Sequence, residues 1–211
     1  MKQNNLISIP PENLPALNPE TNIKLVTYIL DCMYNHDNVG TKRTNHSGWQ
    51  SRYTHELNHI SRHPEIMRLV DTKILDYVRL WISSHEPRMP EMHLTSYGWF
   101  NVNFKNDLNV PHNHINPVNS NYSENIEYSN PLFSGCYYIQ IPDGEENSFY
   151  FTPEYETLHL WFKKDFREFI HTQTGDINLF YPNINHGVVP NKSDHPRITY
   201  SFNVHIHSNQ P

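Results

Sequence analysis

Three histidines and one arginine in the second half of the chain have the spacing of a metal centre with an anchor for an acidic ligand. His112 and His114 stand two residues apart, His186 follows far downstream, and Arg197 comes eleven residues later. Neutral imidazole is a good ligand for divalent iron, and three protein ligands on one face leave positions open for a cosubstrate and dioxygen. The pattern therefore predicts an oxygenase-type iron site in which Arg197 binds the far carboxylate of the cosubstrate.

The spacing of the histidines is weak evidence by itself. Fifteen histidines in 211 residues produce roughly one His-x-His by composition alone, and the chain contains a second at His205-Ile206-His207. In an extended segment, residues two apart point to the same face, so His112 and His114 could bind one ion together. They could equally be surface histidines, and His186 could be an exposed loop residue.

Arg197 begins a segment in which polar and apolar residues alternate. Arg197, Thr199 and Ser201 fall on one face, and the residues between them are apolar. A guanidinium makes bidentate contacts to a carboxylate, and a hydroxyl two residues on can add a third hydrogen bond. A row of polar residues facing solvent fits the same alternation. The sequence leaves open whether the polar face lines a cavity or the surface.

The elements that must position these residues are two helices followed by short strands. Proline at the first helical position and apolar residues at helical spacing predict a helix from residue 19 to about Tyr34, and a second from Pro64 that stops before Pro87. From Met92 the period changes to two, which predicts a jelly roll or barrel. The polar run 116–130 is expected to be a loop, either disordered or a lid that covers the substrate.

Length and composition favour one domain. A flexible tail at 1–18 and a single domain at 19–208 are predicted, with helical support to about residue 90 and the strand core from about 91. The net charge of −6 disfavours general nucleic-acid binding. Cys32 and Cys136 suggest neither a disulfide scaffold nor a thiolate zinc site. No stretch has the length of a membrane span, so a cytoplasmic protein is expected, in the host cytoplasm if it is encoded by a phage.

Six ordered motifs resemble the 2-oxoglutarate/Fe(II)-dependent oxygenase superfamily, and more narrowly a group of oxygenases of bacteriophages and marine bacteria. They cover most of the chain after about Pro19. The motifs are Asn45-His46-Ser47-Gly48-Trp49-Gln50-Ser51, Trp99-Phe100-Asn101-Val102-Asn103, Pro111-His112-Asn113-His114, Ser134-Gly135-Cys136-Tyr137-Tyr138, Phe180-Tyr181-Pro182 leading to His186, and Arg197-Ile198-Thr199-Tyr200-Ser201-Phe202-Asn203.

This resemblance implies a double-stranded β-helix, the jelly-roll core of these enzymes, with supporting N-terminal helices. It also implies roles by position. His112 and His186 match the two histidines of the iron triad, and Arg197 matches the residue that binds the 2-oxoglutarate C5 carboxylate. Thr199 falls where many members have a helping serine. Tyr138 and Asn103 are implied as cavity residues that contact the cosubstrate.

His114 departs from the broad superfamily, which has Asp or Glu at this position, although the narrower group often has histidine. A neutral ligand leaves the iron site one unit more positive, which alters its redox properties and could favour another metal. Either His112, His114 and His186 form a three-histidine triad, or His114 lies behind the site and a carboxylate or water takes its place. Asp107 and Asp194 are the nearest acidic residues in sequence, and neither has ligand spacing.

The function implied is an Fe(II)- and 2-oxoglutarate-dependent dioxygenase. It would use O2 to hydroxylate an unidentified substrate and release succinate and CO2. One alternative is a non-catalytic jelly-roll binding module. The other is a three-histidine metal dioxygenase that does not use 2-oxoglutarate, for which an arginine anchor would be unnecessary. A homodimer is only the default expectation.

Overall fold

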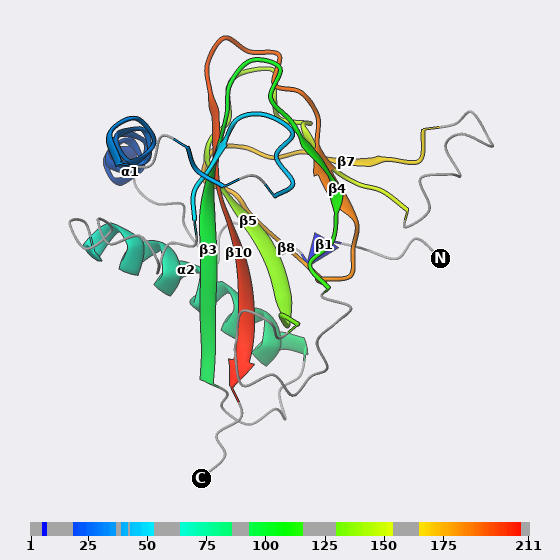
Figure 1. Cartoon of the computed structure of the whole chain (residues 1–211). Coiled ribbons are helices and arrows are strands. Elements are labelled where there is room, and N and C mark those ends of the chain that lie inside the picture. Colours follow the sequence, from blue (N-terminus) through cyan, green and yellow to red (C-terminus); the bar gives the residue numbers. More distant parts are fainter. Residues whose placement is uncertain are drawn as a thin grey trace.

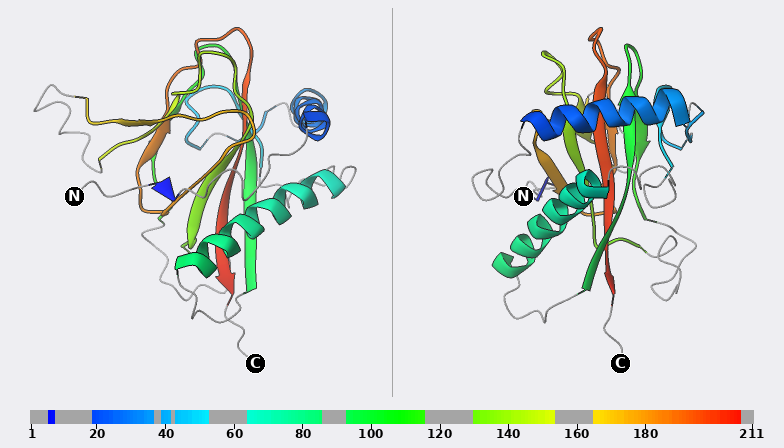
Figure 2. Two further views of the ribbon diagram at one scale, coloured as in Figure 1. Left: turned by 180° about the vertical axis from the view of Figure 1, so that it is seen from behind. Right: turned by 90° about the vertical axis from the view of Figure 1, so that its left-hand side faces the viewer.

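Two antiparallel sheets face each other, and the helices cover the outer side of the larger sheet (Figure 1, Figure 2). The computed structural model describes residues 6–7, 19–36, 39–41, 43–52, 64–85, 93–115, 130–153 and 165–207. Most of the predicted loop 116–130 lies outside these residues. Most of the predicted tail does too, although its residues 6 and 7 form the first strand.

The larger sheet has six strands in the order β1-β8-β5-β10-β3-β2. Their bounds are β1 Leu6–Ile7, β8 Ile177–Phe180, β5 Phe133–Gln140, β10 Arg197–His207, β3 His93–Asn103 and β2 Trp49–Gln50. The smaller sheet has the order β4-β9-β6-β7, with β4 Asn109–His112, β9 His186–Val188, β6 Phe149–Phe151 and β7 Glu168–Ile170. This architecture is a jelly roll, and the predicted fold class is confirmed.

The helices begin where the sequence predicts. Helix α1 spans Pro19–Asp31 and continues as a π-helical turn, η2, over Cys32–His36, and α2 spans Pro64–His85. The regular α-helix therefore ends three residues before Tyr34, where the prediction put its end. The wider turn that follows keeps both Cys32 and Met33 buried. No helix in the described part of the chain is long and apolar enough to cross a membrane.

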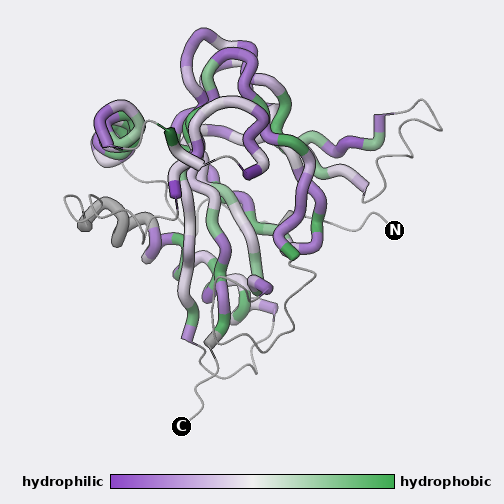
Figure 3. The backbone as a smooth tube through the Cα atoms, in the orientation of Figure 1, coloured by the Kyte–Doolittle hydropathy of each residue, from purple (hydrophilic) through white to green (hydrophobic). Residues whose placement is uncertain are grey.

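The faces of β10 divide the molecule into two interiors. Ile198, Tyr200, Phe202 and Val204 are fully buried and belong to the core between the helices and the larger sheet. Hydrophobic and hydrophilic residues both occur along the strands of the larger sheet (Figure 3). The polar residues of β10 point to the opposite side, where a second apolar cluster lies between the sheets. The polar row that begins at Arg197 therefore faces the inside of the jelly roll, which the sequence had left open.

Gly135 in β5 permits close packing in the core between the helices and the larger sheet. A Cβ atom at Gly135 would overlap the Phe202 ring and would lie 2.5 Å from the backbone oxygen of Asn178. Any larger residue would therefore displace the Phe202 ring and push β5 away from β8. This accounts for the glycine of the Ser134-Gly135-Cys136 motif in physical terms.

Packing of α1 on the larger sheet should contribute strongly to stability. Replacing Ile29, which is fully buried, with alanine should lower the free energy of unfolding by about 2–5 kcal/mol, because transfer and cavity terms add. Ile23 on the same helix is 66% exposed, so Ile23→Ala should cost less than about 0.5 kcal/mol. Urea denaturation measures both. Equal losses would show that α1 does not form part of the folding core.

Candidate metal centre and cosubstrate cavity

The three histidines converge inside the smaller sheet. His112 ends β4 and His186 begins β9, and the two are direct partners in the antiparallel pairing of these strands. His114 lies two residues past β4, where its backbone N–H donates a 2.8 Å hydrogen bond to the Pro182 carbonyl. One ligand atom from each histidine can be chosen so that all lie within 4.8 Å of one another. Metal–nitrogen bonds of about 2.1 Å would bring these atoms to within about 4.2 Å of one another, so binding of a single ion requires a small closing movement.

Hydrogen bonds fix the tautomer of two of these rings. His112 Nδ1 lies 2.9 Å from the Val110 carbonyl oxygen, and His186 Nδ1 lies 3.0 Å from that of Ile184. A carbonyl oxygen only accepts, so each Nδ1 carries the proton and each Nε2 keeps its lone pair. Contacts of this kind orient metal-binding histidines and raise their basicity.

His114 is oriented by the larger sheet. Its Nδ1 lies 2.7 Å from Asn203 Oδ1 and 2.7 Å from Ser134 Oγ, and Ser134 Oγ itself donates to Asn203 Oδ1 at 2.8 Å. The amide oxygen thus accepts from both groups, and His114 Nε2 is left free. The arrangement favours the three-histidine option over the one in which His114 lies behind the site.

The acidic residues nearest in sequence to the histidines, Asp107 and Asp194, contact other groups. Asp107 Oδ2 accepts a 2.8 Å hydrogen bond from the Phe104 backbone N–H. Asp194 is exposed and forms a 2.7 Å ion pair with Lys105. Neither belongs to the histidine group, and no carboxylate takes the place of His114 among the described residues.

Burial keeps the three imidazoles neutral. It lowers the pKa of His112, lowers that of His114 to about 3, and lowers that of His186 well below its usual range. The neighbouring rings lower the pKa of His114 and His186 further, since each would repel a second positive charge. Neutral imidazole is the form that binds metal, so all three are ready to bind at neutral pH.

These shifts predict how the stability of the metal-free protein depends on pH. In the unfolded chain the histidines take up protons near pH 6.5, whereas in the folded protein they stay neutral. The unfolded state then binds more protons, so stability is lost as pH falls below 6.5, down to about 3 for His114. Each group contributes at most about 1.4 kcal/mol per pH unit. Urea denaturation in the presence of a chelator, at pH 7 and pH 5, measures the loss.

The variant His114→Gln provides the control for this pH dependence. Glutamine does not titrate, so the slope of unfolding free energy against pH should become shallower by up to about 1.4 kcal/mol per unit. An unchanged slope would mean that His114 takes up a proton equally in the folded and unfolded states.

A cavity opens from the histidines toward β10. The predicted cosubstrate residues all line it together with the histidines: Asn103, Tyr138, Arg197 and Thr199, with His112, His114 and His186. Phe149 and Phe180 form an apolar wall, and the Phe180 and His186 ring centroids lie 4.5 Å apart. The cavity therefore has a histidine end and a polar end joined by an apolar wall.

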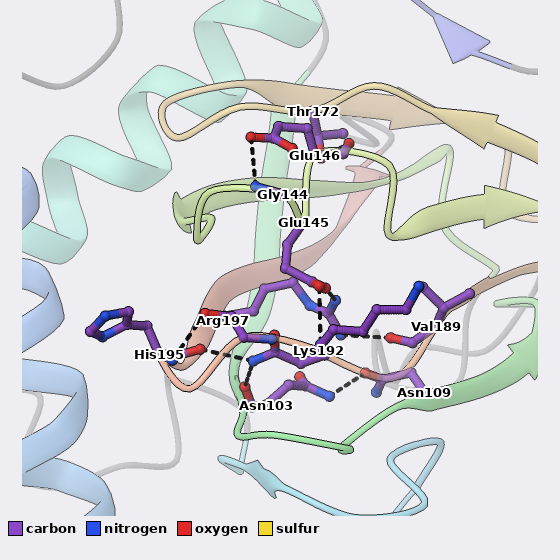
Figure 4. A network of polar contacts seen from close by, with 12 residues as sticks. Asn103, Asn109, Gly144, Glu145, Glu146, Thr172, Val189, Lys192, His195 and Arg197 are labelled. Carbon is purple, nitrogen blue, oxygen red and sulfur yellow. Dashed lines mark hydrogen bonds and ion pairs between the residues drawn. The ribbon is translucent and has the colours of Figure 1, made fainter.

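Arg197 lies at the polar end and is only 2% exposed. Its Nη1 is 3.3 Å from Glu145 Oε2, and its Nη2 donates to the Val189 carbonyl at 3.1 Å (Figure 4). Burial lowers the pKa of Arg197 to about 10, while the carboxylate of Glu145 opposes that shift. The guanidinium is therefore still charged at neutral pH.

Two of the predicted residues already have partners in the cavity wall. Asn103 donates to Asn109 Oδ1 at 3.2 Å, and the Tyr138 hydroxyl accepts a 2.9 Å hydrogen bond from Asn178. By contrast, Asn101 Oδ1 and Ser148 Oγ are buried without a hydrogen-bond partner in the described part of the chain. Both residues line the cavity, where a bound molecule could satisfy them.

Sequence reasoning missed Glu145 and the roles of Asn203 and Ser134. Asn203 follows Arg197 at even spacing on β10, so the period-two pattern alone places it on the cavity face. Glu145 follows Gly144 in a turn between β5 and β6, where no periodicity applies. Nothing in the sequence marked it as the partner of Arg197, which lies 52 positions away.

Comparison with known protein families identifies the chain. The model of a family described as "Putative 2OG-Fe(II) oxygenase" matches residues 97–203, which is half of the sequence and includes all three histidines and Arg197. The chain belongs to this family of 2OG-Fe(II) oxygenases. The narrower grouping with phage and marine-bacterial proteins stays a prediction. No match is found among the curated proteins.

Solved structures show the same fold at low sequence identity. A prolyl-4-hydroxylase from Pseudomonas putida has a TM-score of 0.56 at 9% identity, covering 91% of this chain and 89% of that one. HygX from Streptomyces hygroscopicus, solved with nickel and 2-oxoglutarate, has a TM-score of 0.61 at 12% identity, covering 95% and 82%. The viral collagen prolyl hydroxylase of Paramecium bursaria chlorella virus-1, solved with 2-oxoglutarate, has a TM-score of 0.54 at 12% identity. The match covers 89% of this chain and 91% of that one.

Proposed function

We propose that this oxygenase binds Fe(II) through the Nε2 atoms of His112, His114 and His186. It uses 2-oxoglutarate and O2 to hydroxylate an unidentified substrate, with release of succinate and CO2. The observation that carries the proposal is the convergence of three histidines whose Nδ1 atoms are all engaged by oxygen atoms. Their free nitrogens are left for one ion beside a buried arginine.

The polar end of the cavity fits the far carboxylate of 2-oxoglutarate. Within the described residues, the Arg197 side chain donates to Glu145 and Val189 only, and a guanidinium has five N–H donors. The remaining donors can bind a carboxylate, with the Thr199 hydroxyl beside them in the cavity wall. HygX and the viral hydroxylase, which share the fold, were solved with 2-oxoglutarate.

The iron, when bound with 2-oxoglutarate and O2, supplies the oxidative chemistry. The chain itself holds the reactants and limits the access of water. The pairing of β4 with β9 sets the direction of His112 and His186, and Asn203 sets that of His114. Phe149 and Phe180 pack around His186, so a substrate carbon would approach the metal through an apolar, water-poor region.

One alternative has a specific observation in its favour. A three-histidine site without a carboxylate is also compatible with a metal dioxygenase that does not use 2-oxoglutarate. The ion pair between Glu145 and Arg197 also favours this alternative, because it partly neutralises the charge that would bind the far carboxylate of 2-oxoglutarate. A non-catalytic binding module is less well supported, because all three histidines and Arg197 line one cavity.

An anaerobic absorption titration tests the proposal. Fe(II) is added to the metal-free protein, followed by 2-oxoglutarate. A visible metal-to-ligand charge-transfer band is expected, because the 2-oxo acid chelates the metal. Iron binding without the band would reject 2-oxoglutarate as cosubstrate and favour the alternative dioxygenase. Failure to bind iron would favour the binding module.

A further inference from the structure

Glu145 forms a buried ion pair with the proposed cosubstrate anchor. Its side chain is 5% exposed and that of Arg197 is 2% exposed. One carboxylate oxygen, Oε2, lies 3.3 Å from Arg197 Nη1, and the other, Oε1, accepts a 3.0 Å hydrogen bond from the Lys192 backbone N–H. Figure 4 shows Glu145 extending toward Arg197, while the adjacent Glu146 turns the other way. The turn therefore delivers one carboxylate to the anchor.

The charges of the cavity balance only when Glu145 is counted. The three histidines are neutral and add no charge. A divalent ion and a dianionic 2-oxo acid cancel each other, which leaves the positive charge of Arg197. A buried charge without a partner is costly. A carboxylate at position 114 would have compensated for it at the metal end. In this chain Glu145 supplies the compensating charge at the Arg197 end.

This placement changes what the two ends of the cavity attract. The metal end keeps the full charge of a divalent ion and strongly attracts the 2-oxo-carboxylate group. The far carboxylate of the cosubstrate, by contrast, must share one guanidinium with Glu145. Two carboxylates close together repel each other. The far carboxylate therefore adds less to binding than it would beside an unpaired arginine.

We propose that Glu145 is a specificity-determining residue of the cosubstrate site. It shares the charge of Arg197 and weakens the preference of the site for a dicarboxylic over a monocarboxylic 2-oxo acid. The inference rests on the proposed function. The oxidation chemistry itself is not altered by Glu145, so the effect belongs to binding.

Calorimetric titration of the nickel-loaded protein tests this without turnover. The probes are 2-oxoglutarate and 2-oxopentanoate, which has the same carbon chain without the far carboxylate. The wild-type protein should bind 2-oxoglutarate no more than about tenfold more tightly than 2-oxopentanoate. Glu145→Gln should tighten 2-oxoglutarate binding by roughly tenfold, because a repulsion is removed, and should leave 2-oxopentanoate binding within about twofold.

Two further variants separate charge from structure. Glu146→Gln lies on the same turn but points away from Arg197, so both affinities should stay as in the wild type. Glu145→Asp keeps the charge and should preserve the weak discrimination. If Glu145→Gln weakened 2-oxoglutarate binding, or changed both affinities equally, Glu145 would only position Arg197 and the inference would be wrong.

The wild-type titrations also separate this inference from the proposed function. Binding of neither probe to the nickel-loaded protein would reject the proposed function itself. Tight binding of 2-oxoglutarate, with a preference of several hundredfold over 2-oxopentanoate, would support the function but reject the role of Glu145. This second outcome needs no variant to fold.

Discussion

The variant His186→Ala should lower Fe(II) affinity by at least about 100-fold. The substitution removes one of the three proposed nitrogen ligands, whereas loss of a supporting residue behind a ligand already costs about 10–100-fold in metal affinity. The effect should be direct, because the His186 ligand atom lies within 4.8 Å of those of His112 and His114. Anaerobic titration with a competing chelator measures the affinity, and the charge-transfer band with 2-oxoglutarate should disappear.

The second His-x-His provides the matched control. His205 is also buried, at 6% exposure, and its ring packs edge-on against Tyr97. It lies on β10 outside the histidine group. His205→Gln should therefore leave Fe(II) affinity within about twofold of the wild type. If both variants lost metal equally, the loss would reflect general destabilisation and His186 would not be a specific ligand.

The contrast between the two His-x-His motifs shows what the sequence could predict. Spacing put each pair on one face of a strand, and in that respect they are equivalent. They differ because β4 pairs with β9, which brings His186 opposite His112. That pairing joins residues more than seventy positions apart. From the sequence, the local pattern could not show which of the two His-x-His pairs belongs to the site. Only the family resemblance indicated His112 and His114.

Strand β10 shows a similar limit. Its period of two predicted which residues share a face, and the resemblance implied that Arg197 and Thr199 face a cavity. The alternation itself could not choose between cavity and solvent. The polar face of β10 faces a cavity because of the way the layers stack. The helices cover the apolar face of the strand, and the smaller sheet faces its polar side. The pairing of Glu145 with Arg197 could not be predicted from the sequence, because a residue in a turn has no periodic pattern.

The variant Arg197→Met should weaken 2-oxoglutarate binding by about 100-fold or more. The substitution removes the only cationic partner that the described residues provide for the far carboxylate in this cavity. It also leaves Glu145 buried and uncompensated, so the cosubstrate would meet a bare negative charge. Removing one member of a buried pair also costs about 3–5 kcal/mol of stability. Titration of the nickel-loaded variant and urea denaturation measure the two effects.

Lys192→Gln is the control for loss of a positive charge nearby. Lys192 contacts Glu145 through its backbone N–H, and its side chain is exposed, so its replacement should not change 2-oxoglutarate affinity by more than about twofold. Binding of 2-oxopentanoate to Arg197→Met should likewise stay near that of the wild type. A uniform loss of affinity for both 2-oxo acids would contradict an anchoring role for Arg197.

The double variant Arg197→Met with Glu145→Gln separates the loss of attraction from the gain of repulsion. If Glu145 repels the far carboxylate more strongly once Arg197 is gone, removing its charge should recover more 2-oxoglutarate affinity than the roughly tenfold that Glu145→Gln gains beside Arg197. It should also recover part of the lost stability, because a neutral amide is cheaper to bury than an unpaired carboxylate. An equal effect of Glu145→Gln in the wild type and in Arg197→Met would mean that the two side chains act independently. Non-additive recovery would establish that Arg197 and Glu145 act as one charge-balanced unit at the polar end of the cavity.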